Sequence, residues 1–185
     1  MQRITAVNPS EATGKTKQLL DSVQAKLGIT PNLMKTLAAG PAALEAYLNF
    51  GAALGAGHLE AKFREQIALA VAQANSCEYC LSAHSAIGKM VGLKPEEIAS
   101  SREAHSADAK RDAGLQFVQA LVMQRGVVSD QAVAQVKSAG FTEGDIAEMV
   151  AHVAMNIFTN YFNHVARTDV DFPRVPVAME ATSIA

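Results

Sequence analysis

The chain has no tryptophan, few aromatic residues (5%) and only two cysteines among 185 residues. So few cysteines exclude a small domain held together by several disulfides. Lys and Arg (16) nearly balance Asp and Glu (18), and no dense basic run indicates a nucleic-acid-binding surface. The first residues carry no apolar signal core, and no apolar run reaches the ~20 residues that span a bilayer. We therefore expect a cytoplasmic protein with neither a nucleic-acid nor a membrane partner.

What the chain does contain is alanine and other helix-forming residues, in a composition that is 49% apolar and 18% charged. This mix is typical of helices that pack closely through small side chains. No stretch alternates convincingly as a strand would. We predict an all-α fold, a single-domain bundle of seven to nine helices covering residues 1–185. It comprises N-terminal helices in 1–57, a catalytic helical hairpin in 58–92, C-terminal helices in 93–168 and an irregular tail in 169–185.

Capping residues predict where the helices begin and end. Pro9 or Ser10 opens the first helix, and Gly28 follows its end. Ser76 is the expected N-cap of the second helix of the hairpin, and Thr142 begins a capping box for the last helix. Met34, Leu37 and Phe50 are interpreted as packing residues. The expected helices cover residues 9–26, 31–37, 41–54, 59–74, 76–92, a short segment beginning at 94–97, and then 108–124, 129–138 and 142–165.

The reactive side chains gather between Glu65 and His84. Cys77 and Cys80 are spaced C-x-x-C, and His84 follows four residues later. The helices on either side of Asn75-Ser76 are joined by a very short connection, so we expect an antiparallel hairpin. At ~1.5 Å rise per residue, Glu65 and His84 then lie at similar heights, and Cys80 shares a face with His84.

This order suits a proton relay. The carboxylate orients the imidazole, the imidazole takes a thiol proton, the thiolate attacks, and the second thiol resolves the product. Spacing alone leaves open which cysteine attacks, because Cys77 at the helix start feels the helix dipole more strongly. We favour Cys80 as the attacking thiol, because His84 is a positioned base within its reach. Cys77 would then close the disulfide.

The pattern Glu65-x11-Cys77-x2-Cys80-x3-His84 resembles that of the AhpD-like alkylhydroperoxidases, within the carboxymuconolactone decarboxylase superfamily. The specific match covers about residues 63–92, and the end of the last helix, NYFNHVA, also resembles peroxidase-related members. The resemblance implies an all-helical homo-oligomer, a trimer or hexamer, that reduces organic hydroperoxides with electrons from a thiol reductant protein. It implies Cys80 as peroxidatic, Cys77 as resolving, and Glu65 with His84 as the relay. Tyr79 departs from the pattern, because well-studied peroxidases have a second relay histidine there.

The last expected helix carries an unusual polar line. Its members fall on one side: Glu148, His152, Asn156, Asn160 and Asn163. A solvated face is the usual explanation of such a line, and a subunit interface or a flank of the active pocket is the alternative. The remaining two faces are apolar, which favours an oligomer, with a dimer as a further option. Glu148, Asn160 and Asn163 also repeat the spacing of Glu65, Cys77 and Cys80, which suggests an internal duplication.

Other interpretations of the cysteine pair remain open. The two thiols could be small buried hydrophobes, or Cys77, Cys80 and His84 could bind zinc, although a structural zinc site normally needs a fourth ligand. The competing functions are a general thiol–disulfide oxidoreductase, a decarboxylase-like enzyme using Glu65 and His84, and a non-catalytic redox-sensing or metal-binding module. No glycine-rich nucleotide loop or haem-attachment spacing is present, so we expect no cofactor and no resident metal.

Overall fold

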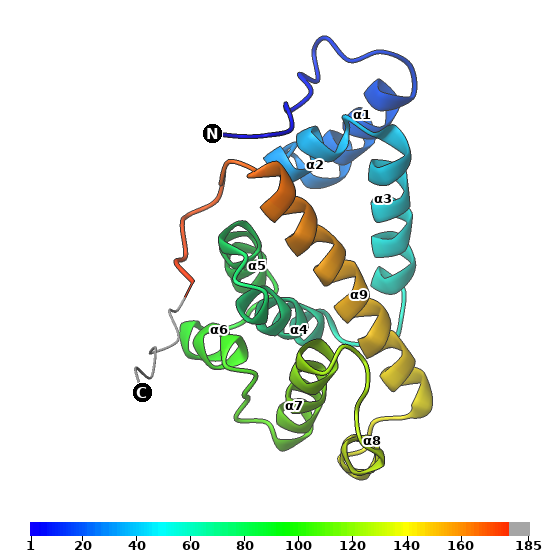
Figure 1. Cartoon of the computed structure of the whole chain (residues 1–185), viewed down its shortest axis with the longest axis vertical. Coiled ribbons are helices and arrows are strands. Elements are labelled where there is room, and N and C mark those ends of the chain that lie inside the picture. Colours follow the sequence, from blue (N-terminus) through cyan, green and yellow to red (C-terminus); the bar gives the residue numbers. More distant parts are fainter. Residues whose placement is uncertain (178–185) are drawn as a thin grey trace.

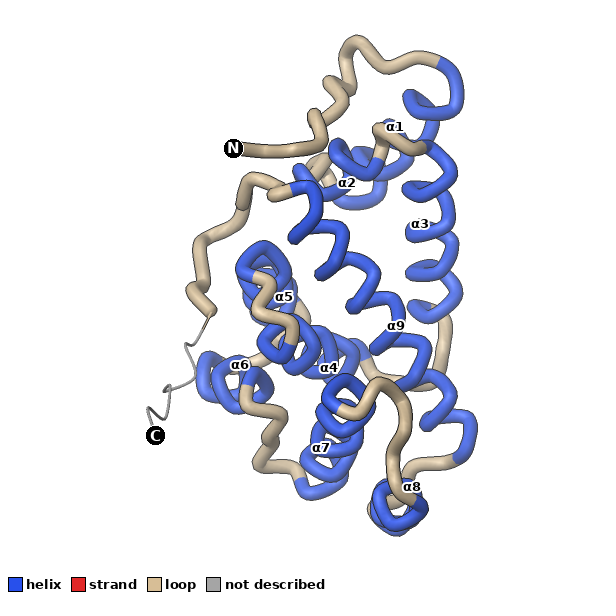
Figure 2. The backbone as a smooth tube through the Cα atoms, in the orientation of Figure 1, coloured by secondary structure: helices blue, strands red, loops and turns tan. Residues whose placement is uncertain are grey.

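The computed structural model describes residues 1–177, and every regular element within that range is a helix (Figure 2). This confirms the all-α prediction, and the count lies at the upper end of the expected range. The nine helices are α1 (Gly14–Leu27), α2 (Asn32–Leu37), α3 (Pro41–Gly55), α4 (Ala61–Ala74), α5 (Glu78–Met90), α6 (Pro95–Arg102), α7 (Ala109–Met123), α8 (Asp130–Ser138) and α9 (Glu143–Ala166).

Helix α4 is the centre of the packing. It contacts α5, α6, α7 and α9, and the long α9 runs diagonally past it to reach α3 and the N-terminal helices (Figure 1). Two apolar clusters meet at α4: Leu69 and Ala72 belong to one, while Ile67 and Val71 belong to the other. The apolar run of α4 therefore faces a core on both sides, as expected for a helix that enters the interior.

Most predicted helix ends are confirmed. Gly28 closes α1 with a left-handed φ of 74°, and the Thr142 hydroxyl accepts the N–H of Asp145 in a capping box. The predicted start of α1 is wrong. The side chain of Asn8 accepts the N–H of Ser10 and holds a turn there, so that the helix begins only at Gly14.

The predicted N-cap Ser76 is also wrong. Ser76 adopts a left-handed φ of 54° and completes the turn after α4, while the N-cap is Cys77. The Cys77 sulfur thus takes the place of the usual cap oxygen. Phe50 is another wrong prediction: Met34 and Leu37 are buried, but Phe50 is 39% exposed on the outer side of α3.

The internal duplication is contradicted by the helix boundaries. Residues 61–90 fold back on themselves as the two helices α4 and α5, whereas residues 143–166 form the single helix α9. Ser76 breaks the first segment with its positive φ, while Thr159, which stands 83 residues later, is helical. The two segments therefore cannot superimpose, and the shared spacing does not reflect a shared shape.

The segment after α9 is irregular, as predicted, but it is not loosely attached. It leaves the end of α9 and passes beside α5 towards α6 (Figure 1). The backbone N–H of Val175 donates to Ser82 Oγ of α5 at 3.0 Å, and Arg174 pairs with Glu78. Arg102 of α6 donates to the carbonyl of Pro176. The remainder of the predicted tail, 178–185, lies outside the described residues.

Candidate active site

The α4–α5 hairpin brings Glu65 and His84 together as the residue spacing predicts. His84 Nδ1 lies 2.7 Å from Glu65 Oε2, and the two side chains are 21% and 17% exposed. An ionised carboxylate only accepts hydrogen bonds, so Nδ1 carries the proton in this pair. A neutral His84 then has its lone pair at Nε2, which makes it a potential base.

Cys77 and Cys80 form a disulfide at the start of α5, with Cα atoms 5.3 Å apart. Both residues are almost fully buried. Cys77 Sγ accepts the N–H of Cys80 at 3.3 Å as the helix cap. The first turn of α5 thus supplies a donor to Cys77, consistent with the dipole argument from the sequence.

A cleft with a volume of about 460 Å³ opens beside Cys80. Cys80 and His84 both line it, which confirms that they share a face of α5, whereas Cys77 is not part of its wall. The other walls come from α1, α2, α3, α9 and the C-terminal segment, and they are mainly apolar. They include Val23, Leu27, Leu33, Met34, Tyr47, Leu48, Met155 and Phe172.

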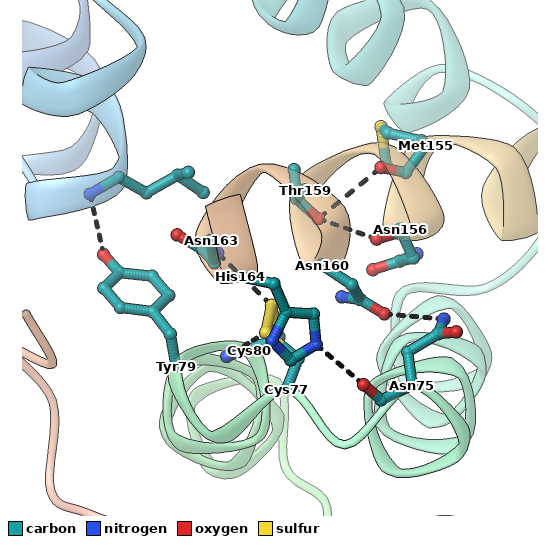
Figure 3. The surroundings of a disulfide bond; sticks show 11 residues. Asn75, Cys77, Tyr79, Cys80, Met155, Asn156, Thr159, Asn160, Asn163 and His164 are labelled. Atoms are coloured by element: carbon teal, nitrogen blue, oxygen red, sulfur yellow. Dashed lines mark hydrogen bonds between the residues drawn. A yellow bond between two sulfur atoms is a disulfide. The ribbon is translucent and has the colours of Figure 1, made fainter. Parts of the chain in front are cut away.

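Helix α9 closes the opposite side of the cysteine pair with amide side chains (Figure 3). Asn163 Nδ2 donates to Cys80 Sγ at 3.3 Å, and Asn160 Oδ1 accepts from Asn75 Nδ2 at 3.0 Å. His164 Nε2 donates to the carbonyl of Asn75 at 2.8 Å. These contacts fix α9 against the turn that joins α4 to α5.

The solvated interpretation of the polar line on α9 is therefore wrong. Four of its members are buried with exposures of 5% or less: His152, Asn156, Asn160 and Asn163. Asn163 contacts Cys80, a residue of the cleft wall, but the α9 residues that line the cleft itself are Met155 and Thr159. Burial lowers the pKa of His152, and the nearby charge of Arg64 lowers it further. The inner side of α9 is thus polar but carries little charge.

Glu148, the remaining member of the line, binds the backbone of the loop that leads into α4. Its carboxylate accepts the backbone N–H of His58 at 2.9 Å and that of Leu59 at 3.1 Å. These bonds, the His58 bond most of all, hold the pKa of Glu148 below its usual value. A Cβ on Gly57 would lie 2.6 Å from Glu148 Oε2, so glycine permits this close approach.

Tyr79, which stands where a second relay histidine was expected, has a structural role. Its phenolic oxygen accepts the N–H of Leu33 at 3.0 Å, and its ring meets Phe172 edge-on. Burial raises the pKa of Tyr79 far above its usual range, with the negative charge of Asp171 adding to the rise. A phenol with so high a pKa stays protonated near neutral pH and is a poor base there. Tyr79 therefore does not take the place of the expected second histidine, and Glu65 and His84 are the candidate relay pair.

The sequence argument missed two cleft residues that come from distant segments. Tyr47 reaches the cleft from α3, and burial together with the charge of Glu65 raises its pKa to about 12. Phe172 reaches it from the irregular segment after α9. No spacing rule connects either residue with the C-x-x-C motif, because their proximity depends on how the helices pack.

Two searches of the described residues bear on the alternatives. Within residues 1–177 no three His, Cys, Asp or Glu side chains are grouped in a way that could hold a metal ion. Within the same range, no helix has the length of apolar sequence needed to cross a membrane. The second finding includes α9, whose inner side carries the buried polar line.

The described residues combine an all-α fold with a cysteine pair close to a carboxylate–imidazole pair, and comparisons show which known proteins this chain is similar to. Residues 41–121 match the model of the carboxymuconolactone decarboxylase family. A segment of 46 residues, 24% of the chain, is 54% identical to an uncharacterized protein of Haemophilus influenzae and spans 41% of that protein's length.

Two solved structures share the whole architecture. The AhpD-core, peroxidase-related protein from Ralstonia eutropha JMP134 is 25% identical, with a TM-score of 0.83 over 95% of this chain and 97% of that one. The debrominase Bmp8, solved with 2,3,4-tribromopyrrole, is 19% identical, with a TM-score of 0.78 over 92% of each chain. The second likeness concerns the fold alone. The family match over residues 41–121 and the likeness to the AhpD-core protein both support a place for the chain in the carboxymuconolactone decarboxylase superfamily, near its AhpD-like, peroxidase-related members.

Proposed function

We propose that the protein is a thiol-dependent peroxidase that reduces organic hydroperoxides through a dithiol–disulfide cycle of Cys80 and Cys77. One observation carries the proposal. Cys80 and His84 line the same apolar cleft, and His84 is held by Glu65 at 2.7 Å. The cleft admits an apolar substrate to one sulfur only, and the base lies one helical turn away from that sulfur.

The chemical steps balance with these residues. His84 Nε2 takes the proton of the Cys80 thiol, and the thiolate attacks the outer peroxide oxygen. The O–O bond breaks, His84 returns the proton to the leaving alkoxide, and an alcohol and Cys80 sulfenic acid result. The Cys77 thiol then attacks the Cys80 sulfur, releasing water and closing the disulfide. A thiol reductant protein, the proposed partner, supplies two electrons and two protons to reopen it.

Stopped-flow oxidation of the reduced protein by cumene hydroperoxide tests this proposal. Cys77→Ser should react once and leave a sulfenic acid on Cys80 that a dimedone probe labels. Cys80→Ser should show no rapid phase. The opposite pattern would reverse the two roles. Rapid disulfide exchange without any peroxide reaction would favour a general thiol–disulfide oxidoreductase instead. Activity that survives loss of both cysteines would favour acid–base chemistry by Glu65 and His84.

A homo-oligomer, trimer or hexamer, is proposed as the working assembly. The outer side of α9 presents large apolar side chains to solvent, including Phe158 (40% exposed), Tyr161 (58%) and Val165 (58%). A monomer has little reason to expose such a patch. Light scattering coupled to gel filtration should give a mass of three or six chains, and Tyr161→Lys should lower it. A two-chain mass would instead favour the dimer, and a monomeric parent would end the proposal.

Reductive debromination is a second candidate. Three aromatic side chains, Tyr47, Tyr79 and Phe172, line the cleft beside Cys80, and they suit a flat ring. The same dithiol could supply two electrons that replace a carbon–bromine bond by carbon–hydrogen, with bromide released and the disulfide formed. Bromide release from 2,3,4-tribromopyrrole by the reduced protein, compared with oxidation by cumene hydroperoxide, separates the two candidates.

A further inference from the structure

The sulfur of Cys80 has a neighbour that the proposed peroxidase cycle does not yet use. Asn163 Nδ2 donates to Cys80 Sγ at 3.3 Å across 83 residues of sequence (Figure 3). Asn163 is only 5% exposed, and its side chain reaches the sulfur from the side opposite the α4–α5 hairpin. A disulfide sulfur is a weak acceptor, whereas a thiolate is a strong one, so this contact gains strength when Cys80 is reduced and ionised.

The position of this amide is set by its neighbours on α9. One turn earlier, Asn160 accepts from Asn75, and the adjacent His164 donates to the carbonyl of Asn75. Asn75 directly precedes the turn that leads to Cys77. The donor therefore need not move to meet a developing charge on Cys80, and preorganised donors stabilise charge at little reorganisation cost.

The two sulfurs have separate donors. Cys77 Sγ accepts from the backbone N–H of Cys80, while Cys80 Sγ accepts from Asn163. At the Cys80 sulfur itself, α9 presents the neutral side chain of Asn163. The charged or titratable groups around the cleft come from several elements: Lys26 of α1, Tyr47 of α3, Glu65 of α4, Tyr79 and His84 of α5, and the more distant His152 and His164 of α9.

We propose that Asn163 is a further catalytic residue, whose amide N–H stabilises Cys80 as a thiolate and holds its sulfur towards the cleft. Tyr79 does not stabilise the reactive thiol, because its hydroxyl accepts the backbone N–H of Leu33. Asn163 provides that stabilisation from α9 instead. The inference rests on the proposed function in that Cys80 is the attacking thiol. Its test does not depend on peroxide chemistry.

The test uses the full chain with Cys77→Ser, in which Cys80 is the only thiol. Thiolate absorbance at 240 nm then reports the pKa of Cys80 directly. In Asn163→Leu, which has no donor, that pKa should rise by about one, so that alkylation by iodoacetamide slows roughly tenfold at pH values below it. At a pH where the thiol is fully ionised, the alkylation rate of this variant should return to within about threefold of its parent, which a general structural defect would not allow.

Asn163→Asp keeps the shape and adds a negative charge, so its Cys80 pKa should rise further. Asn156→Asp is the matched control, because Asn156 is equally buried on α9 but donates to the carbonyl of His152 instead of to sulfur. It should leave the Cys80 pKa unchanged. An unchanged pKa in Asn163→Leu, or an equal rise in Asn156→Asp, would overturn the proposal. If the parent fails to react with cumene hydroperoxide while the pKa still responds to Asn163, the peroxidase function fails and the role of Asn163 stands.

Discussion

The cysteine pair lies between two unlike walls. The reactive wall, formed by α4 and α5, carries Glu65, Cys77, Cys80 and His84, and its groups can give up or take a proton. The amide wall is the inner side of α9 and carries His152, Asn156, Asn160 and Asn163, which are neutral or kept neutral by burial. In the proposed mechanism, the reactive wall supplies the groups that react, and the amide wall positions the Cys80 sulfur without adding charge.

Loss of the nucleophile on the reactive wall should have the largest effect. Cys80→Ser is expected to reduce turnover of cumene hydroperoxide at least ~1,000-fold, because no other thiol faces the cleft. Its matched control is Cys77→Ser, which should lose turnover but retain the first rapid oxidation. Equal loss of the first oxidation in both variants would remove the distinction between the two sulfurs.

Loss of the relay charge comes next. Glu65→Gln keeps the size of the side chain but removes the carboxylate that accepts from His84 Nδ1, so the tautomer with a basic Nε2 is no longer favoured. We expect the rate of Cys80 oxidation at neutral pH to fall about 100-fold, with little change in melting temperature. In His84→Ala, the rate of Cys80 oxidation should fall by a similar factor. A Glu65→Gln enzyme of normal rate would exclude the relay.

The amide wall should respond in stability more than in rate. Asn160 is fully buried and accepts from Asn75, so Asn160→Leu should cost about 1–2 kcal/mol of unfolding free energy in urea titrations. The rate of Cys80 oxidation should fall less than tenfold. If the rate in Asn160→Leu fell as far as in Glu65→Gln, the two walls would not have the distinct roles proposed for them.

Tyr79 offers a test within the reactive wall. Tyr79→Phe removes the acceptor of the buried Leu33 N–H, and about 1 kcal/mol of stability should be lost. The pH profile of Cys80 oxidation should keep its shape, because the phenol does not take part in proton transfer. A shifted pH profile would return Tyr79 to the relay.

The smallest expected effect concerns His152. Its pKa is lowered in the folded protein, chiefly by burial, so the unfolded chain binds a proton first as the pH falls. The stabilisation is complete above the unfolded pKa of about 6.5 and declines below it. The melting temperature should therefore fall between pH 7 and pH 5, and His152→Gln should flatten that decline. An identical slope in His152→Gln would show that other groups cause it.

The reactive wall was predictable from the sequence, and the amide wall was not. The spacing of Glu65, Cys80 and His84 around one short turn determines their geometry, because helix rise and periodicity are nearly constant. Asn156, Asn160 and Asn163 also follow helical spacing, but polar residues in that pattern are typical of a solvated face. Asn160 and Asn163 are instead buried against Asn75 and Cys80 of the α4–α5 hairpin, and these contacts depend on tertiary packing. Tyr47 and Phe172 escaped prediction for the same reason.

The segment that follows α9 has a practical bearing on how the cleft is studied. Asp171 accepts the N–H of Asn32, the carbonyl of Asp169 accepts from the Asn32 amide, and Phe172 packs on Tyr79 and lines the cleft. Part of the wall of the cleft is thus formed by a segment that belongs to no helix. Shortening the protein at Ala166 would keep all the helices described within residues 1–177 and every proposed catalytic side chain, yet it would remove Phe172 from the cleft wall. Substrate preferences measured on such a shortened form would describe a different binding site.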